Sequence, residues 1–289
     1  MYAIVGITGQ VGGATARTLL AQGHRVRAVV RSAAKGEPWA QRNAEVAVAD
    51  VLDTPALERA FRGVDGVFVM SPPNFAPSPG FPELREVTDS IGRALAAAAP
   101  PKIVFLSSIG AQHSHGLGLI HGSHFCEQAF GRLRLPVAFL RAGWFMENSA
   151  WDAPSAVRTG EISSFLQPLD RAFPMVATED IGRVAAETLL ETWDDQRIIE
   201  LEGPRRYTQH DLATAFGVAL GRRVVAKAVP RETWTSLFQS QGNPWPEPRI
   251  EMLDGFNSGW IEFAKNGTEH RFGRIAFESV ARELLHHTA

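Results

Sequence analysis

The sequence predicts an α/β protein built on a doubly wound, mostly parallel sheet. Short apolar runs alternate with helical segments about six times in the first half of the chain. A glycine-rich turn joins the first apolar run to the first helix, and shorter, less regular segments follow beyond Trp144. Strand–helix alternation of this kind implies parallel strands with helices on both faces of the sheet.

Six strands are expected in the first half because each of these runs is apolar or rich in β-branched residues. They cover residues 2–7, 26–30, 44–49, 64–70, 103–106 and 137–140. The helices between them are expected at 10–22, 54–61 and 83–99, with another helix ending over 127–133. Gly23 is expected to end the first helix, and Thr54 can cap the second one.

The second half of the chain predicts a smaller domain. A helix is expected at 178–191 with Thr178 as its cap, and a second helix at 208–220 ends before Gly221. The remaining expected elements are strands at 197–201 and 224–229, a loop at 242–248 and a helix at 277–285. We therefore assign residues 1–150 to the large domain and expect residues 178–201 to pack into the same domain. Residues 151–177 and 202–289 are assigned to a smaller α/β domain.

Composition excludes several classes of protein. The 289 residues are 45% hydrophobic, and 29 basic against 31 acidic residues give a net charge of −2. This balance argues against a nucleic-acid-binding protein, which needs a basic surplus. A single cysteine, Cys126, excludes an internal disulfide framework and a multi-cysteine metal site. With no basic leader and no apolar run of about 18 residues, we expect a cytoplasmic protein without a membrane span.

The turn after the first strand is the strongest candidate for a ligand site. In an open α/β sheet, ligands bind beyond the carboxyl ends of the strands. Here the spacing is Gly-x-x-Gly-x-x-Gly, and glycines allow backbone N–H groups to approach a pyrophosphate at a helix N-terminus. The residues predicted to contact a dinucleotide in this turn are Gly6, Thr8, Gly9, Gln10, Val11 and Gly12.

The end of the second strand indicates which dinucleotide binds. An acidic residue there would accept a hydrogen bond from a free ribose 2′-hydroxyl, but this chain has Arg31, with Lys35 nearby. An arginine can pair with a 2′-phosphate through charge-assisted hydrogen bonds, so NADP(H) is the predicted cofactor. Asp50 ends the third strand, where it can contact the adenine edge or cap the next turn.

Other strand ends supply further candidates. Ser71 and Pro72 follow the fourth strand, and Ser107 ends the fifth, so these three join the predicted cofactor site. The residues after the sixth strand offer an apolar wall and one amide for a planar substrate: Gly143, Trp144, Phe145 and Asn148. A second set of aromatic residues can form the opposite wall or simply pack a helix: Trp245, Phe256, Trp260 and Phe263.

At this point the chain resembles the NmrA-like group of atypical short-chain dehydrogenases/reductases. The resemblance rests on the Gly6-x-x-Gly9-x-x-Gly12 turn and on four further segments. These are Val29-Val30-Arg31, Phe105 to Ala111, His124-x-x-Glu127 and Phe139 to Asn148, and Thr178 to Gly182 extends the match. This resemblance implies a Rossmann domain that binds NADP(H) and a small C-terminal substrate domain. The group includes quinone and enone reductases as well as non-catalytic NADP sensors.

The chain departs from a full short-chain dehydrogenase at the proton donor. Such enzymes use a serine and a Tyr-x-x-x-Lys pair, but neither Tyr2 nor Tyr207 is followed by lysine at that spacing. Ser108 matches the serine, and His121 or His124 stands near the tyrosine position. Either histidine can donate a proton near neutral pH, and either can instead form local hydrogen bonds.

Three other groups near this position are expected to be inactive. A metal site built from His121, His124 and Glu127 has no further support. His113 and His115 are expected to be solvated in a glycine-rich loop, and Cys126 is expected to be buried and unreactive.

Two functions remain open. The first is NADPH-dependent reduction of a quinone or similar conjugated carbonyl, whose product solvent can protonate, so that positioning matters more than a protein acid. The second is a redox sensor that binds NADP(H) without turnover and regulates a protein partner.

Overall fold

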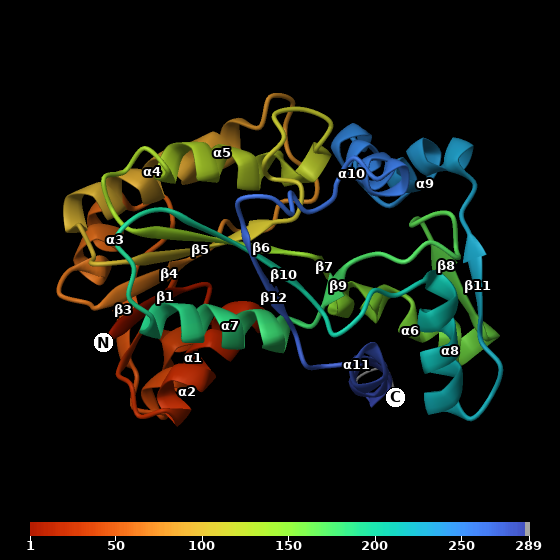
Figure 1. Ribbon diagram of the computed structural model, residues 1–289, viewed down its shortest axis with the longest axis horizontal. Coiled ribbons are helices and arrows are strands. Elements are labelled where there is room, and N and C mark those ends of the chain that lie inside the picture. The colour runs from red at the N-terminus through yellow and green to blue at the C-terminus, as the bar shows by residue number, and fades with distance from the viewer. Residues whose placement is uncertain (287–289) are drawn as a thin grey trace.

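The computed structural model describes residues 1–286. Its central sheet has eight strands in the order β12-β10-β6-β5-β4-β1-β2-β3, and every neighbouring pair is parallel (Figure 1). The strands are β1 (Tyr2–Val5), β2 (Val26–Val30), β3 (Glu45–Val48), β4 (Gly66–Val69), β5 (Ile103–Ser108), β6 (Val137–Ala142), β10 (Arg197–Glu202) and β12 (Glu269–Phe272). The predicted doubly wound α/β class is confirmed.

Helices cover both faces of the sheet. One face carries α1 (Gln10–Ala21), α2 (Ala33–Ala40) and α7 (Thr178–Leu190); the other carries α3 (Thr54–Phe61), α4 (Pro82–Ala98) and α5 (His121–Phe130) (Figure 1). Side chains of β1 alternate between the two cores, because Ile4 packs in the cluster of Leu19 and Val5 packs in the cluster of Phe61.

The helix starts differ from the sequence prediction in three places. Helix α2 was not predicted, since Gly36 and Pro38 interrupt its helical pattern. The predicted cap of α3, Thr54, is wrong, because the preceding Asp53 accepts the Ala56 N–H. The predicted cap of α7 is also wrong. The cap position is the residue before Thr178, and the Thr178 N–H donates to both oxygens of Glu147 at 2.9 and 3.0 Å.

Glycine allows α7 to pack closely against α1. A Cβ atom on Gly182 would lie 2.3 Å from the Ala14 Cβ and 2.7 Å from the Thr15 backbone nitrogen. Real Cβ atoms do not approach other atoms so closely, so any side chain at this position would push the two helices apart. This contact holds α1 against the sheet and fixes the start of that helix beside the end of β1.

The second half of the chain builds a smaller unit beyond β6 and β10 (Figure 1). Its helices are α6 (Ala153–Thr159), α8 (Gln209–Leu220), α9 (Trp234–Ser240), α10 (Glu247–Ser258) and α11 (Phe277–His286), with short 3-10 turns at Met146–Trp151 and Arg231–Thr233. A further 3-10 turn, Gly118–Ile120, precedes α5 in the first half of the chain. Two small sheets pair β8 (Glu161–Ser164) with β11 (Val225–Ala228) and β7 (Trp144–Phe145) with β9 (Met175–Val176). The expected loop at 242–248 is wrong for its last two residues, which begin α10.

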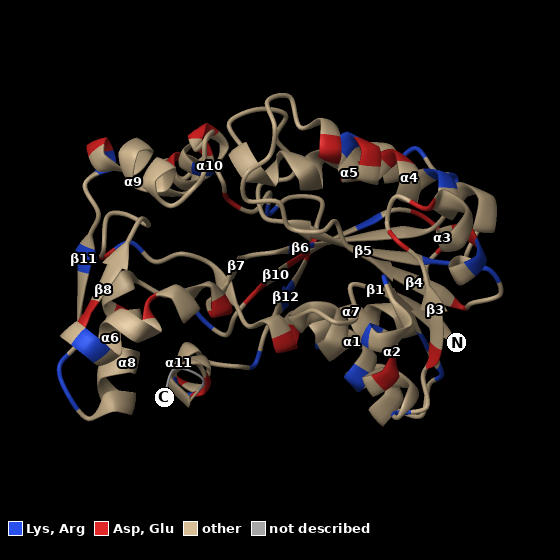
Figure 2. Cartoon of the chain, turned by 180° about the vertical axis from the view of Figure 1, so that it is seen from behind, with Lys and Arg blue, Asp and Glu red and all other residues tan. Residues whose placement is uncertain are grey.

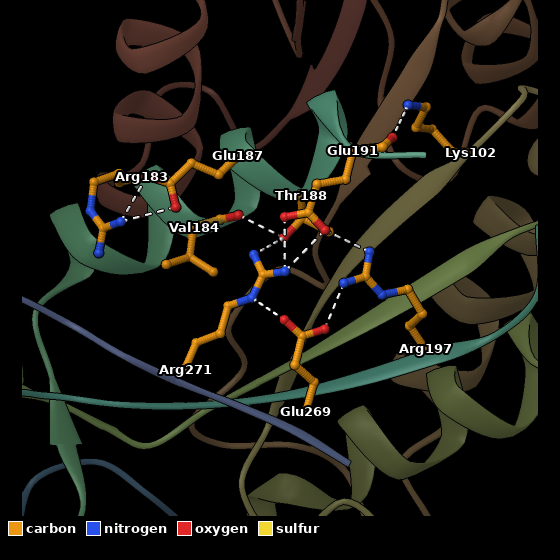
Figure 3. A network of polar contacts seen from close by, with 9 residues as sticks. All are labelled: Lys102, Arg183, Val184, Glu187, Thr188, Glu191, Arg197, Glu269 and Arg271. Atoms are coloured by element: carbon orange, nitrogen blue, oxygen red, sulfur yellow. Dashed lines mark hydrogen bonds and ion pairs between the residues drawn. The ribbon is translucent and has the colours of Figure 1, made fainter. Parts of the chain in front are cut away.

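An ion-pair network ties the outer strands to the rest of the sheet (Figure 3). Glu269 of β12 bonds Arg197 of β10 at 2.6 Å and Arg271 at 2.5 Å. Glu191, directly after α7, accepts from both arginines. Because β12 forms an edge of the sheet, these charged side chains also make that edge unsuitable for pairing with another strand.

Charges of both signs are distributed over the whole molecule (Figure 2). This distribution agrees with the near-zero net charge of the sequence. Within residues 1–286, no helix is both long enough and apolar enough to cross a membrane.

Candidate functional site

The turn between β1 and α1 has the geometry of a phosphate-binding loop. Gly6 has φ +71°, and Gly9 occupies the cap position of α1. A Cβ atom on Gly12 would lie 2.4 Å from the Gly6 carbonyl oxygen, so only glycine fits there. The turn is therefore closed tightly over its own backbone.

This turn presents hydrogen-bond donors to its surroundings. The N–H groups in the first turn of α1 have no partner within the helix, and they point outward at its positive end. Thr8, Gly9 and Gln10 are exposed, whereas Val11 and Gly12 are buried behind them. An anionic group placed at this helix start would meet backbone donors that have no partner within the helix.

Two cations follow β2. Arg31 and Lys35 are exposed, and neither side chain forms a hydrogen bond or ion pair with any residue of the described chain. Arg27 of the same strand differs, because it bonds Glu45 at 2.6 Å and is not available. Asp50 accepts the Leu52 N–H at 3.0 Å and thus caps the turn after β3, while its contact with adenine stays a prediction.

A buried polar row lies beneath the ends of β5, β6 and β10. Ser107, Arg141 and Glu200 are neighbours in register across the three strands, and all three are buried. Glu127 of α5 accepts the Ser107 hydroxyl at 2.6 Å and two bonds from Arg141 at 2.9 and 2.6 Å. The Ser107 hydroxyl, predicted to bind the cofactor, is therefore directed at Glu127.

Glu200 completes this row. It lies 4.0 Å from Arg141 and accepts the backbone N–H groups of Ala264 and Lys265 at 2.6 and 3.1 Å. The partnership of Arg141 with Glu127 and Glu200 was not predicted, because it depends on the strand register that places Ser107, Arg141 and Glu200 side by side.

The candidate proton donors lie on or next to α5. Ser108 is partly exposed and forms no side-chain hydrogen bond with the described residues. His124 Nδ1 lies 2.9 Å from the Ala111 carbonyl oxygen, to which a protonated Nδ1 donates. His121 Nε2 lies 3.3 Å from the Ser114 carbonyl oxygen, and its Nδ1 is buried without a partner. Both histidines form local hydrogen bonds through one ring nitrogen each, and a role for either as proton donor stays a prediction.

His121 also belongs to an aromatic cluster. Its ring centroid lies 5.5 Å from that of Phe81 and 5.7 Å from that of Phe125. Trp245, from the second half of the chain, lies 5.8 Å from Phe81. This arrangement connects the loop after β4, which contains Ser71 and Pro72, to the segment before α10.

The expectation that His113 is solvated is wrong. Its ring stacks on Trp260 at 4.1 Å, and burial lowers the pKa of the imidazole. His115 is exposed but lies 5.1 Å from the same tryptophan, whose Nε1 donates to the His115 carbonyl at 3.0 Å. Gly116 makes this contact possible, since a Cβ there would lie 2.9 Å from the Trp260 Nε1.

The predicted substrate residues fall into two groups. Trp144 and Phe145 are partly buried, and Asn148 is exposed without a hydrogen-bond partner in the described part of the chain. Gly143 is buried, and a Cβ there would lie 2.7 Å from the Pro174 carbonyl oxygen, so it serves packing. Phe256 of α10 meets Trp144 edge to face at 5.2 Å, which brings one of the proposed opposite-wall residues to Trp144.

Cys126 is buried, as expected, and no metal cluster is found among the described residues. Burial raises the pKa of the Cys126 thiol to about 12. No cluster of three or more histidine, cysteine, aspartate or glutamate side chains among residues 1–286 could hold a metal ion. Glu127, the acid of the conceivable metal trio, is occupied by Arg141.

Comparison with known proteins gives consistent matches along the chain. Quinone oxidoreductase 2 of Escherichia coli (strain K12) is 26% identical over 246 residues, covering 84% of this chain and 83% of that protein. NAD(P)H azoreductase of Xenophilus azovorans is 25% identical over 245 residues, covering 84% and 82%.

A solved structure and a family model agree with these relatives. The NADPH complex of the NADPH-dependent quinone oxidoreductase from Escherichia coli superposes with a TM-score of 0.80 at 23% identity, covering 98% of this chain and 99% of that one. At that identity the likeness establishes the fold. The model described as the NmrA-like family matches residues 2–258.

Proposed function

The chain belongs to the NmrA-like family, and from that premise we propose that it is an NADPH-dependent reductase of quinones or similarly conjugated electrophiles. The observation that carries the proposal is the pair of unpartnered cations directly after β2, beside the exposed donors of the glycine turn. A ligand that bears both a pyrophosphate and a further phosphate on its adenosine ribose matches these two features.

Different residues would bind the pyrophosphate and the 2′-phosphate of the cofactor. The first-turn N–H groups of α1 would hold the pyrophosphate, and Gly12 keeps the backbone close enough for them to reach it. Arg31 would hold the 2′-phosphate through parallel hydrogen bonds, with Lys35 as a second positive charge. When bound, the reduced nicotinamide supplies a hydride.

The state of the possible proton donors supports a conjugated substrate. Tyr207 is fully buried, and its hydroxyl accepts the Phe277 N–H at 3.0 Å, so it is not a donor at this site. His121 and His124 are engaged with backbone carbonyls. A quinone tolerates this arrangement, because hydride addition gives a stabilised hydroquinone anion that water can protonate, whereas an isolated ketone needs an acid at the oxygen.

The surroundings of Trp144 support a planar substrate. Trp144 is partly exposed next to the exposed Asn148, and its ring is fixed by Phe256. A flat conjugated ring can stack on the indole while the amide donates to a carbonyl oxygen. The names of the two relatives, a quinone oxidoreductase and an azoreductase, agree with this substrate class.

The test is NADPH and NADH oxidation against a panel of quinones and simple ketones, with cofactor affinity measured in parallel. Wild type should prefer NADPH and reduce quinones. Arg31→Asp should weaken NADPH binding by about ten- to a hundredfold, because a charge-assisted hydrogen bond is lost and a repulsion is added.

Arg25→Asp is the matched control. Arg25 is also exposed and unpartnered in the described chain, but it precedes β2, about 20 Å from Arg31 along the strand. The Arg25→Asp variant should leave the preference for NADPH over NADH unchanged. Equal or tighter binding of NADH by wild type would refute the cofactor assignment.

The missing Tyr-x-x-x-Lys pair also favours a second candidate, a sensor that binds NADP(H) without turnover and acts on a protein partner. Tight NADPH binding without oxidation by any acceptor in the panel would replace the reductase with this sensor.

A further inference from the structure

One arginine in the second half of the chain lacks a counter-charge. Arg249, the third residue of α10, is partly buried, and within residues 1–286 it forms no hydrogen bond or ion pair. Its guanidinium lies 4.2 Å from the ring centroid of Phe238 and 5.9 Å from that of Phe165. Burial lowers the pKa of this guanidinium, and no neighbouring carboxylate raises it.

Two other arginines of this region do have counter-charges. Arg206 bonds Glu202 and Glu262 at 2.8 Å each. Arg231 also lies over an aromatic ring, 4.9 Å from Trp234, but it pairs with Asp254 at 2.7 Å. Arg171, which is also partly buried and lies over Phe173, has no carboxylate either, but it donates to the Asn257 carbonyl at 2.6 Å. Arg249 differs from Arg231 and Arg171 in having neither a carboxylate nor a hydrogen-bond acceptor among the described residues.

The direction of Arg249 follows from the faces of α10. One face, formed by Pro248, Met252 and Gly255, packs on the 116–118 turn and on Ile261, since Cβ atoms on Gly118 and Gly255 would collide there. Arg249 and Phe256 are seven residues apart and therefore lie on one stripe of the helix, beside Met252 at the edge of this face and separated from each other by about 10 Å of helix. Phe256 contacts Trp144 on this stripe.

We propose that Arg249 binds an anionic group, a carboxylate, sulfonate or phosphate, on a substrate whose conjugated ring lies at Trp144. This inference rests on the proposed reductase function and adds a specificity-determining residue to it. A guanidinium that stacks through its face keeps its N–H edge available for two parallel bonds to an oxyanion. An incoming anion would supply the counter-charge that the protein itself does not provide.

The test compares two forms of one substrate. A naphthoquinone with a hexanoate tether and its neutral hexanamide counterpart have the same reacting ring and differ in charge. Wild type should show a kcat/KM about ten- to a hundredfold higher for the carboxylate, and Arg249→Met should remove this ratio. Arg249→Lys should keep part of it. Arg231→Met, which also removes a stacked arginine, should keep all of it.

A ratio near one in wild type, or a ratio that survives Arg249→Met, would overturn the proposal. NADPH affinity and the far-ultraviolet circular dichroism spectrum of each variant establish that it is folded. Direct binding of both naphthoquinones to protein saturated with NADP⁺ separates this proposal from the reductase itself. If neither compound is reduced but the carboxylate binds more tightly in an Arg249-dependent way, the reductase fails and the anion site stands.

Discussion

Asp152 should make the protein less stable at neutral pH than at acidic pH. This residue directly precedes α6 and is largely buried, and its carboxyl forms no hydrogen bond or ion pair with the rest of the described chain. Burial raises the pKa of this carboxyl from its ordinary 3.8 to about 7. The charged form is thus disfavoured in the folded protein relative to the unfolded chain.

The sign follows from the proton balance. Below about pH 4 the carboxyl is protonated in both states, so it costs no stability. Between about pH 4 and 7 the unfolded chain loses the proton and the folded protein keeps it, so stability falls as pH rises. Above about pH 7 the carboxyl is ionised in both states, and the folded protein carries the full free-energy cost of burying the charge. This cost is at most about 4 kcal/mol, because part of the side chain still meets water.

Asp152→Asn tests this directly. The variant should be more stable than wild type at pH 8, by up to about 4 kcal/mol, and the two should converge near pH 4. Urea unfolding followed by tryptophan fluorescence at several pH values measures the difference. Asp170→Asn serves as control, since Asp170 is exposed and unpartnered in the described residues. A stability difference between wild type and Asp152→Asn that does not change with pH would refute the argument.

Two further outcomes concern the glycine turn and the thiol. Gly12→Ala should abolish NADPH binding and destabilise the fold by about 1–3 kcal/mol, because its Cβ would lie 2.4 Å from the Gly6 oxygen. Gly92→Ala is the control, because its Cβ would meet nothing closer than 3.7 Å, and it should change neither property. NADPH titration measures the binding, and thermal unfolding measures the stability. Cys126 should resist iodoacetamide at pH 8 in the folded protein and react in urea, since a thiol of pKa about 12 is ionised in about one molecule in ten thousand. Rapid labelling of native protein, detected by mass spectrometry, would contradict the burial.

The N-terminal fold was predictable because its strands and helices are encoded locally. The expected strand at 26–30 and helix at 54–61 coincide with β2 and α3, where apolar runs end at clear breaks. Helix α2 was missed, because Gly36 and Pro38 remove the local signal and packing supplies the stability instead. A Cβ on Gly36 would lie 2.4 Å from a methyl group of Val46, so this glycine is needed for contact with β3.

The second half was less predictable because its short elements depend on distant partners. Helix α9 and helix α10 carry weak patterns, yet Trp234 and Phe238 are fully buried against residues from the whole of that half. The same reason hid Arg249, since its lack of a carboxylate is a property of its surroundings and not of its neighbours in sequence. Domain boundaries at 150, 178 and 201 remain a prediction.

Strand register explains why the hydroxyl of Ser108, and not that of Ser107, is free to contact a substrate. Ser107 lies beside Arg141 and is bonded by Glu127, so its hydroxyl is part of the buried row. Side chains alternate along a strand, so Ser108 points to the other face, where its hydroxyl has no partner in the described chain. A serine hydroxyl without a tyrosine–lysine pair can position a carbonyl oxygen but lacks the acid of a full short-chain dehydrogenase. For the reductase that we propose, this favours substrates whose reduced form is a stabilised anion, a requirement that restricts the chemistry more tightly than the shape of the aromatic wall does.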